Sequence, residues 1–206
     1  MITAGVFLKE LKNFIYTAGG ALVPSGQENG FGGEYAGFTY TSQYNGGFAK
    51  VKGVEISYSQ QFTFLPGFWS GFGAYANLTK LQAEGNYGAG AAVALAPTSK
   101  IAGFNPTNGN VGISYIRNRA SVRLQLNYRG RYLTTFNVNE SRLVYLRPRP
   151  MVSLKLNYRI SKNFDAYMDL ANVTDTPDGS SEFGGGRVGT MTYLYPQFLF
   201  GLNGRL

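Results

Sequence analysis

The stretch that decides the fold is MVSLKLNYRISKNFDAYMDLANVTD, residues 151–175. Apolar and polar side chains alternate one by one from Val152 to Ile160, and the alternation resumes after residues 161–163. Successive side chains of a β-strand point to opposite faces, so this period of two predicts two long strands joined by a tight turn. Each strand has one apolar face, and that face meets either a protein core or a lipid bilayer.

The composition favours a protein whose outer face is not in water. The 206 residues include 15 Tyr, 15 Phe and 28 Gly, and only 15% of them are charged, against roughly 25% in a typical soluble domain. The absence of Cys and His removes thiolate chemistry, the commonest metal ligand and the commonest general base. We therefore expect a protein that is not an enzyme, with no catalytic residue, no metal site and no cofactor.

The formal net charge of +8 raises the question of a nucleic-acid partner. The basic residues are spread through the predicted strands, and the sequence contains no helix-turn-helix or RNA-binding signature. We therefore expect no nucleic acid. The sequence also lacks a stretch near the roughly 20 apolar residues of a transmembrane helix, and its beginning does not resemble a secretory signal peptide.

The same alternation predicts eight strands, and the connections between them are of two kinds. The strands are expected at about residues 2–19, 36–64, 69–83, 109–117, 120–134, 150–160, 163–173 and 187–206. Tight turns at 65–68, 117–119 and 161–163 alternate with long loops rich in Gly, Pro, Ser and Asn at about 20–35, 84–108, 135–149 and 174–186. Long strands with all long loops at one end are typical of outer-membrane barrels, whereas soluble sandwiches have strands of about five or six residues.

Two further features agree with an antiparallel transmembrane β-barrel in contact with outer-membrane lipid. Aromatic residues gather near strand ends, as an interfacial girdle requires; they are Phe68, Trp69, Tyr128, Tyr132, Tyr158, Tyr193 and Tyr195. Seven charged residues of the strands fall on the face opposite the apolar one; they are Glu55, Arg123, Arg129, Lys155, Arg159, Asp165 and Asp169. On the lipid face, a Lys or Arg at mid-depth would cost roughly 2–4 kcal/mol.

Three stretches resemble the C-terminal barrel of TonB-dependent outer-membrane receptors. They are AGVFLKELKNFI (4–15), with its Phe-x-Lys core; NGGFAKVKGVEISYSQQFTFLPGFWSGFGAYANLT (45–79), with a Gly-Val-Glu strand and a Leu-Pro-Gly turn; and LANVTDTPDG (170–179) with YPQFLFGLNGRL (195–206). The resemblance implies a receptor of the bacterial outer membrane for a scarce solute such as an iron–siderophore, cobalamin or a glycan. It also implies a TonB energy-transducing complex as partner, acting through a plug domain.

The family's barrels have about 22 strands, whereas this sequence predicts eight. We expect neither the family's plug domain nor a signal peptide within these residues. We therefore expect residues 1–206 to be one partial barrel domain, an open curved sheet whose strands 2–19 and 187–206 are not paired with each other. The alternatives are a complete eight-stranded barrel with a structural or adhesion role and a soluble β-sandwich binding module.

Candidate ligand contacts lie in the predicted outer loops. Arginines clustered in one loop suit an anionic ligand or lipopolysaccharide phosphates, and loop aromatics suit stacking on a sugar or siderophore. The candidates are Tyr35, Tyr87, Phe104, Arg142, Tyr145, Arg147 and Phe183; Arg149 and Phe31 belong to the same groups. A solvated basic loop and aromatics that only pack the loops together are the alternative interpretations.

Overall fold

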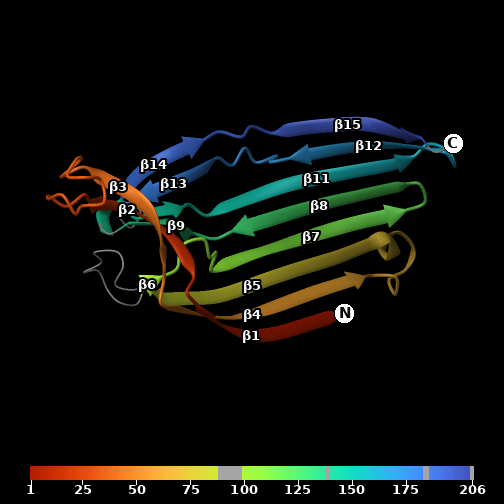
Figure 1. The fold of residues 1–206 in the computed structure, drawn as a ribbon. Coiled ribbons are helices and arrows are strands. Elements are labelled where there is room, and N and C mark those ends of the chain that lie inside the picture. Colours follow the sequence, from red (N-terminus) through yellow and green to blue (C-terminus); the bar gives the residue numbers. More distant parts are fainter. Residues whose placement is uncertain (88–98, 138–139, 183–185, 205–206) are drawn as a thin grey trace.

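The computed structural model describes residues 1–87, 99–137, 140–182 and 186–204. Within these ranges it is an all-β chain built from two sheets (Figure 1). The main sheet has nine antiparallel strands in the order β1 (Ile2–Lys12), β4 (Phe48–Gln61), β5 (Phe72–Asn86), β7 (Thr107–Arg117), β8 (Ala120–Arg129), β11 (Arg149–Arg159), β12 (Phe164–Ala171) and β15 (Gln197–Gly204), with β6 (Ser99–Lys100) beside the end of β5. The predicted all-β antiparallel fold of about eight long strands is confirmed.

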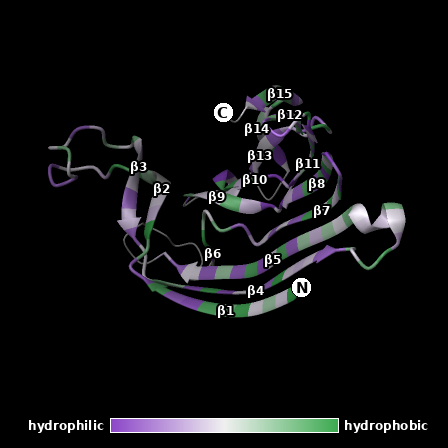
Figure 2. Ribbon diagram, turned by 90° about the vertical axis from the view of Figure 1, so that its right-hand side faces the viewer, coloured by the Kyte–Doolittle hydropathy of each residue, from purple (hydrophilic) through white to green (hydrophobic). Residues whose placement is uncertain are grey.

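The register of the main sheet aligns the apolar residues of all its long strands on one face. Val111 lies opposite Ala76 on β5 and Leu126 on β8, and Leu124 lies opposite Ile113 and Leu154. The same rows continue to both ends of the sheet, through Val6, Val54, Ile56, Leu78, Met168, Leu170, Phe198, Phe200 and Leu202. Figure 2 shows the resulting bands along the curved sheet. This apolar face is largely uncovered: Val6 is 84% exposed and Phe200 is 80% exposed.

The opposite, polar face carries the ion pairs of the strands β11 and β12 and a ladder of amides and hydroxyls. Lys155 pairs with Asp169 across β11 and β12 at 3.1 Å, and Arg159 pairs with Asp165 at 3.6 Å. On β5, Tyr75 lies over Gly112 of β7, where an added Cβ would come within 2.4 Å of the ring. That glycine lets the Tyr75 hydroxyl reach past β7 and donate to Gln125 Oε1 at 2.6 Å.

The six-stranded second sheet lies at one end of the main sheet (Figure 1), and it revises the predicted loops. Its strand order is β14 (Arg187–Thr192), β13 (Asp178–Glu182), β10 (Val144–Leu146), β9 (Tyr132–Asn137), β2 (Ile15–Leu22) and β3 (Thr39–Asn45). Four predicted strands are therefore each divided between the two sheets, at residues 13–14, 46–47, 130–131 and 193–196. Parts of the predicted loops 135–149 and 174–186 form strands, because pairing satisfies backbone groups that an irregular loop would leave open.

The opposite end of the main sheet carries the short turns and both termini (Figure 1). One turn contains a short 3-10 helix, Gly67–Gly71, and here Phe68 and Trp69 pack against Phe72 and Tyr115 with ring centroids 4.9–5.7 Å apart. Phe68 and Trp69 are two of the residues that the sequence predicted for an aromatic girdle, and they lie together at this end of the sheet. The structure thus separates a short-turn end from a loop end.

The main sheet is open at both edges. β1 pairs only with β4 and β15 pairs only with β12 among the described strands, so the expectation that the first and last strands are not paired is confirmed. A complete eight-stranded barrel needs a ladder between those two strands, and that alternative is contradicted. No helix among the described residues is long and apolar enough to span a membrane.

A charge placed on the apolar face tests its contact with lipid. Leu124 lies in the middle of β8 on this face, and Leu124→Arg is expected to cost about 2–4 kcal/mol of membrane-inserted stability. Asn157→Arg on the polar face of β11 is the control, because Asn157 is exposed and points away from the apolar face. The measurement is the urea concentration at the midpoint of unfolding of the membrane-inserted protein, with the folded fraction detected by gel mobility. Equal midpoints for the two variants would show that this face is not in lipid.

Candidate functional site

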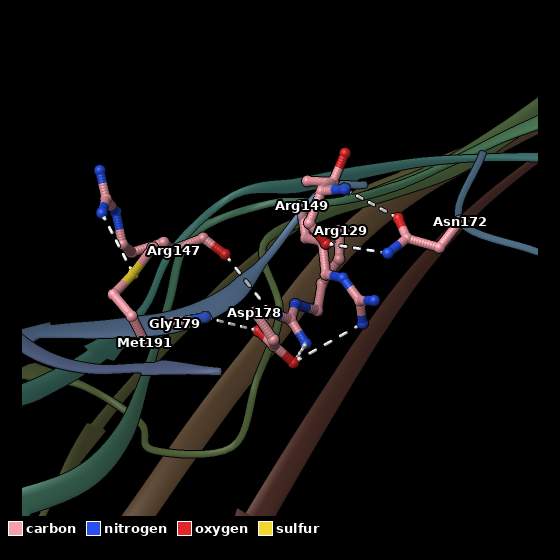
Figure 3. A network of polar contacts seen from close by, with 8 residues as sticks. Arg129, Arg147, Arg149, Asn172, Asp178, Gly179 and Met191 are labelled. Carbon is pink, nitrogen blue, oxygen red and sulfur yellow. Dashed lines mark hydrogen bonds and ion pairs between the residues drawn. The ribbon is translucent and has the colours of Figure 1, made fainter. Parts of the chain in front are cut away.

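At the loop end of the main sheet, two neighbouring strands each carry an arginine as the last residue of their polar face. Arg129 closes β8, Arg149 opens β11, and the register places them directly opposite each other. Like charges in that position repel and destabilise a sheet. Asp178, at the start of β13, lies between them (Figure 3): its carboxylate is 2.5 Å from Arg129 Nη2 and 3.7 Å from Arg149 Nη1.

The carboxylate of Asp178 is held ionised by its surroundings. The hydrogen bond from Arg129 is the main cause that holds its pKa below the ordinary value of 3.8, and partial burial opposes it. The backbone N–H of Gly179 also donates to Asp178 Oδ1 at 2.9 Å. The side chains of Arg129, Arg149 and Asp178 are only 28%, 16% and 26% exposed, so solvent screens the charges weakly.

The cluster has more positive charge than one carboxylate can balance. Arg147 joins it from the preceding segment: its backbone N–H donates to Gly179 O at 2.8 Å, and its own carbonyl accepts from Arg129 Nη2 at 3.4 Å. Two guanidinium groups thus share one carboxylate, whereas the exposed Arg147 side chain turns to Met191, with its Nη1 3.5 Å from the sulfur (Figure 3). The Nε atoms of Arg129 and Arg149 are buried and have no hydrogen-bond partner among the described residues. Such a surplus of fixed donors suits a carboxylate, catecholate or phosphate group.

A hollow of about 310 Å³ lies at the same end of the sheet, and it brings together two of the residues predicted from the sequence. Phe104 and Tyr145 both line it, and the guanidinium of Arg131 lies 4.3 Å from the centroid of the Tyr145 ring. Glu84 and Lys100 complete its charged lining. Aromatic faces beside charged groups can hold a planar ligand by stacking and cation–π attraction.

Tyr87, another predicted ligand contact, is built into the interior of the loop end. It is 2% exposed and stacks on Phe136 at a centroid distance of 3.9 Å, with Tyr16 edge-on at 4.7 Å. Its hydroxyl donates to Lys100 O at 2.7 Å and accepts from the Ala102 N–H at 3.0 Å. Burial is the main cause that raises its pKa to about 12.

The remaining predicted contacts are dispersed. Tyr35 is 56% exposed in the turn between β2 and β3, where its ring meets Phe31 and Phe38 edge-on. Arg142 ends a short 3-10 helix, Glu140–Arg142, and is exposed. Phe183 lies outside the described residues. Of the seven predicted contacts, Arg147 lies in the arginine cluster and Phe104 and Tyr145 line the hollow.

The sequence reasoning did not name Arg129 and Asp178 as site residues. The alternation of β8 places Arg129 on the polar face at the strand's last position, a signal that was available. No sequence pattern indicated Asp178, because its position beside the arginines depends on how β13 pairs in the second sheet. Among the described residues, no three acidic side chains lie close enough to hold a metal ion.

The comparisons with known proteins agree on one family. The family model "TonB dependent receptor-like, beta-barrel" matches residues 1–173. No curated protein matches the chain in sequence.

Solved structures match the chain over 98% of its length. They include the ferric-catecholate import receptor Fiu of E. coli K12, with TM-score 0.59, 19% identity and 25% of that chain covered. The copper transporter OprC has TM-score 0.62, 14% identity and 28% covered. The ferric enterobactin receptor PfeA of Pseudomonas aeruginosa in complex with enterobactin has TM-score 0.59, 18% identity and 29% covered. The chain therefore spans little more than a quarter of the length of the receptors whose fold it shares.

Removing the Tyr87 hydroxyl tests whether this residue holds the loop end together. Tyr87→Phe keeps the ring stack but leaves the Ala102 N–H unpaired, so a loss of about 1–3 kcal/mol is expected. The measurement is hydrogen exchange of the 99–102 segment, which should become faster. Tyr35→Phe, at an exposed tyrosine, is the control and should change nothing. Unchanged exchange in Tyr87→Phe would contradict the role of the hydroxyl.

The arginine cluster should make the loop end sensitive to acid. A carboxylate whose folded-state pKa is depressed stabilises the fold above its unfolded pKa, and this contribution disappears as the pH falls through the lower, folded value. For Asp178 the loss should begin near pH 4 and continue below it, because its pKa lies below 3.8. Thermal midpoints measured from pH 7 down to about pH 2 should fall less in Asp178→Asn than in the wild type. Glu28→Gln, at an exposed turn residue, should behave as wild type; an Asp178→Asn profile parallel to it would contradict the assignment.

Proposed function

Because this chain belongs to the TonB-dependent receptor β-barrel family, we propose that it forms part of the wall of a receptor that takes up a scarce solute. Proteins of this family reside in the bacterial outer membrane, so the apolar face of the main sheet meets lipid. The polar face then lines the lumen. The loop end, with the second sheet, faces outward from the cell, and the short turns face the periplasm.

The proposed activity is transport rather than catalysis. The family consists of receptors for uptake, and the solute would be an iron–siderophore, cobalamin or a glycan. A TonB energy-transducing complex would drive uptake by acting on a plug domain inside the barrel. What supports a role of this chain in solute binding is the place of the arginine cluster, because Arg129 and Arg149 lie at the loop end of the polar face.

The charge of the cluster favours an anionic iron chelate over the other two solutes. Arg129 and Arg149 share a single carboxylate and Arg147 lies beside them, so the site attracts anions and offers directed donors to them. A neutral glycan would leave that charge unmatched. Of the receptors with the same fold, one is named for ferric catecholates and another for ferric enterobactin. A ferric tris-catecholate is a multiply charged anion with planar rings. The observation that carries the proposal is the pair of largely buried guanidinium groups, Arg129 and Arg149, that share a single carboxylate at the loop end of the polar face.

The experiment is solute binding by the receptor that contains this chain, purified from outer membranes. Ferric tris-catecholate, cobalamin and a neutral oligosaccharide are titrated against the wild type and against Arg129→Gln/Arg149→Gln. We expect the anionic chelate to bind and the double variant to lose roughly tenfold to a hundredfold in affinity, because hydrogen bonds to charged groups contribute about 1.5–3 kcal/mol.

Arg159→Gln is the matched control, because Arg159 is a lumen-wall arginine of β11 that pairs with Asp165 at the opposite, short-turn end. It should bind the chelate as wild type does. Tight binding of the oligosaccharide or cobalamin, with no chelate binding, would overturn the assignment of an anionic solute. Equal losses in both arginine variants would show that the cluster is not the site.

A further inference from the structure

A row of lysines continues the lipid-facing side of the main sheet beyond its apolar rows. Lys50 and Lys52 have the same parity as Val54 on β4, and Lys80 has the same parity as Leu78 on β5. Neither strand pair has a register shift, so these side chains point to the outside of the barrel, as Val54 and Leu78 do. Lys12 on β1 and Lys100 on β6 lie on the same face. We call Lys12, Lys50, Lys52, Lys80 and Lys100 the lysine row.

The lysine row begins where the apolar rows end. Lys80 lies directly opposite Val54, and Lys52 lies directly opposite Leu8. All five lysines are on the loop side of that boundary, the side that faces out of the cell, and all five are exposed. The row therefore lies at the depth where the outer leaflet of the membrane changes from hydrocarbon to headgroups.

The spacing of the lysines suits a ligand with more than one anionic group. Lys50 and Lys52 are two residues apart on one strand, about 7 Å. Lys52 and Lys80 are diagonal neighbours on adjacent strands, about 7–8 Å apart. Long flexible stems allow each ammonium group to reach several positions at headgroup level while the methylenes cover apolar surface.

Few acidic groups oppose the lysine row. On the same face of these strands lie Glu10, which is 3.9 Å from Lys50, and Glu84, which accepts a hydrogen bond from Gln82. The Glu10–Lys50 pair is exposed, with side chains 70% and 54% accessible, so it neutralises little of the charge. Five ammonium groups against two carboxylates leave a positive surface on the outside of the barrel. At its β6 end the row borders the hollow that Lys100 and Arg131 line.

We propose that the lysine row binds the phosphate groups of an anionic glycolipid in the outer leaflet. The charge is of the right sign, and the row adjoins the apolar face, so one molecule can place its acyl chains on that face and its phosphates on the lysines. Each lysine near an anionic membrane surface contributes to binding, and the contributions add. The proposal does not depend on which solute the receptor takes up.

The experiment compares Lys50→Gln/Lys52→Gln/Lys80→Gln with Arg117→Gln/Arg119→Gln/Lys162→Gln in the receptor purified from outer membranes. The control removes the same charge from exposed residues at the short-turn end. Bound phosphorylated glycolipid per receptor is counted by mass spectrometry. The delipidated receptor is then titrated with a bisphosphorylated glycolipid of the lipid A type in detergent micelles. We expect the lysine triple variant to bind roughly tenfold to a hundredfold more weakly at low salt, and the control to bind as wild type.

Three further measurements test whether binding needs the lipid phosphates, whether free phosphate can replace the lipid, and whether the glutamine variant loses charge or loses its fold. The dephosphorylated glycolipid should bind both variants and the wild type equally weakly, and inorganic phosphate should not displace the lipid at matched concentration. Lys50→Arg/Lys52→Arg/Lys80→Arg should restore binding if the loss in the glutamine variant is a loss of charge. The proposal is overturned if the lysine and control variants retain equal lipid, if the dephosphorylated lipid binds the wild type as tightly, or if free phosphate competes fully. Failure of any of these arms leaves chelate binding by the lumen arginines unaffected, so the two proposals fail independently.

Discussion

The structure depends on one constraint: backbone N–H and C=O groups in hydrocarbon have no water to bond with, so each must pair with another strand. The main sheet meets this requirement with long uninterrupted ladders. β4 and β5 pair over fourteen consecutive positions, from Phe48 opposite Asn86 to Gln61 opposite Gly73. Among the described pairs, register shifts occur only in the second sheet, where water or other loops can satisfy an unpaired group. Long regular ladders are thus confined to the main sheet.

Uninterrupted pairing also explains why the two faces differ so completely in chemistry. A slip of one residue would move a strand's whole apolar set to the other face, so the register and the side-chain pattern must agree in every strand. They do: Leu124 and Leu154 face each other on the lipid side, while their neighbours Arg123 and Lys155 face each other on the lumen side. Lys155 then pairs with Asp169. Charge repulsion across the lumen wall is thus relieved by the next strand.

The sequence predicts the long strands, in which the side-chain pattern repeats. It does not predict the second sheet, which depends on pairing between segments that are distant in sequence. A period of two is visible in every long strand, so the fold class and the two faces could be predicted before any coordinates. The open edges are predicted from the resemblance to a family whose barrels have more strands. The second sheet could not be predicted, because β2, β9 and β13 are short and pair with segments distant in sequence. The same applies to the site. Arg147 stood out as part of a basic run, but Asp178, which sets the charge of the cluster, is placed only by the path of β13.

The two basic surfaces of the chain use different residues, and the difference follows from what each would bind. The lumen cluster is built around Arg129 and Arg149, whose planar guanidinium groups are held by Asp178. Fixed forks suit a compact anion that must be recognised and then released. The outer row is built from lysines on flexible stems, which are strongly hydrated point charges. Headgroups move laterally and vary in structure, so reach and charge matter more there than directed geometry. One thin sheet can therefore present a selective anion site on its lumen side and an adaptable lipid contact on the other, separated by a single layer of backbone.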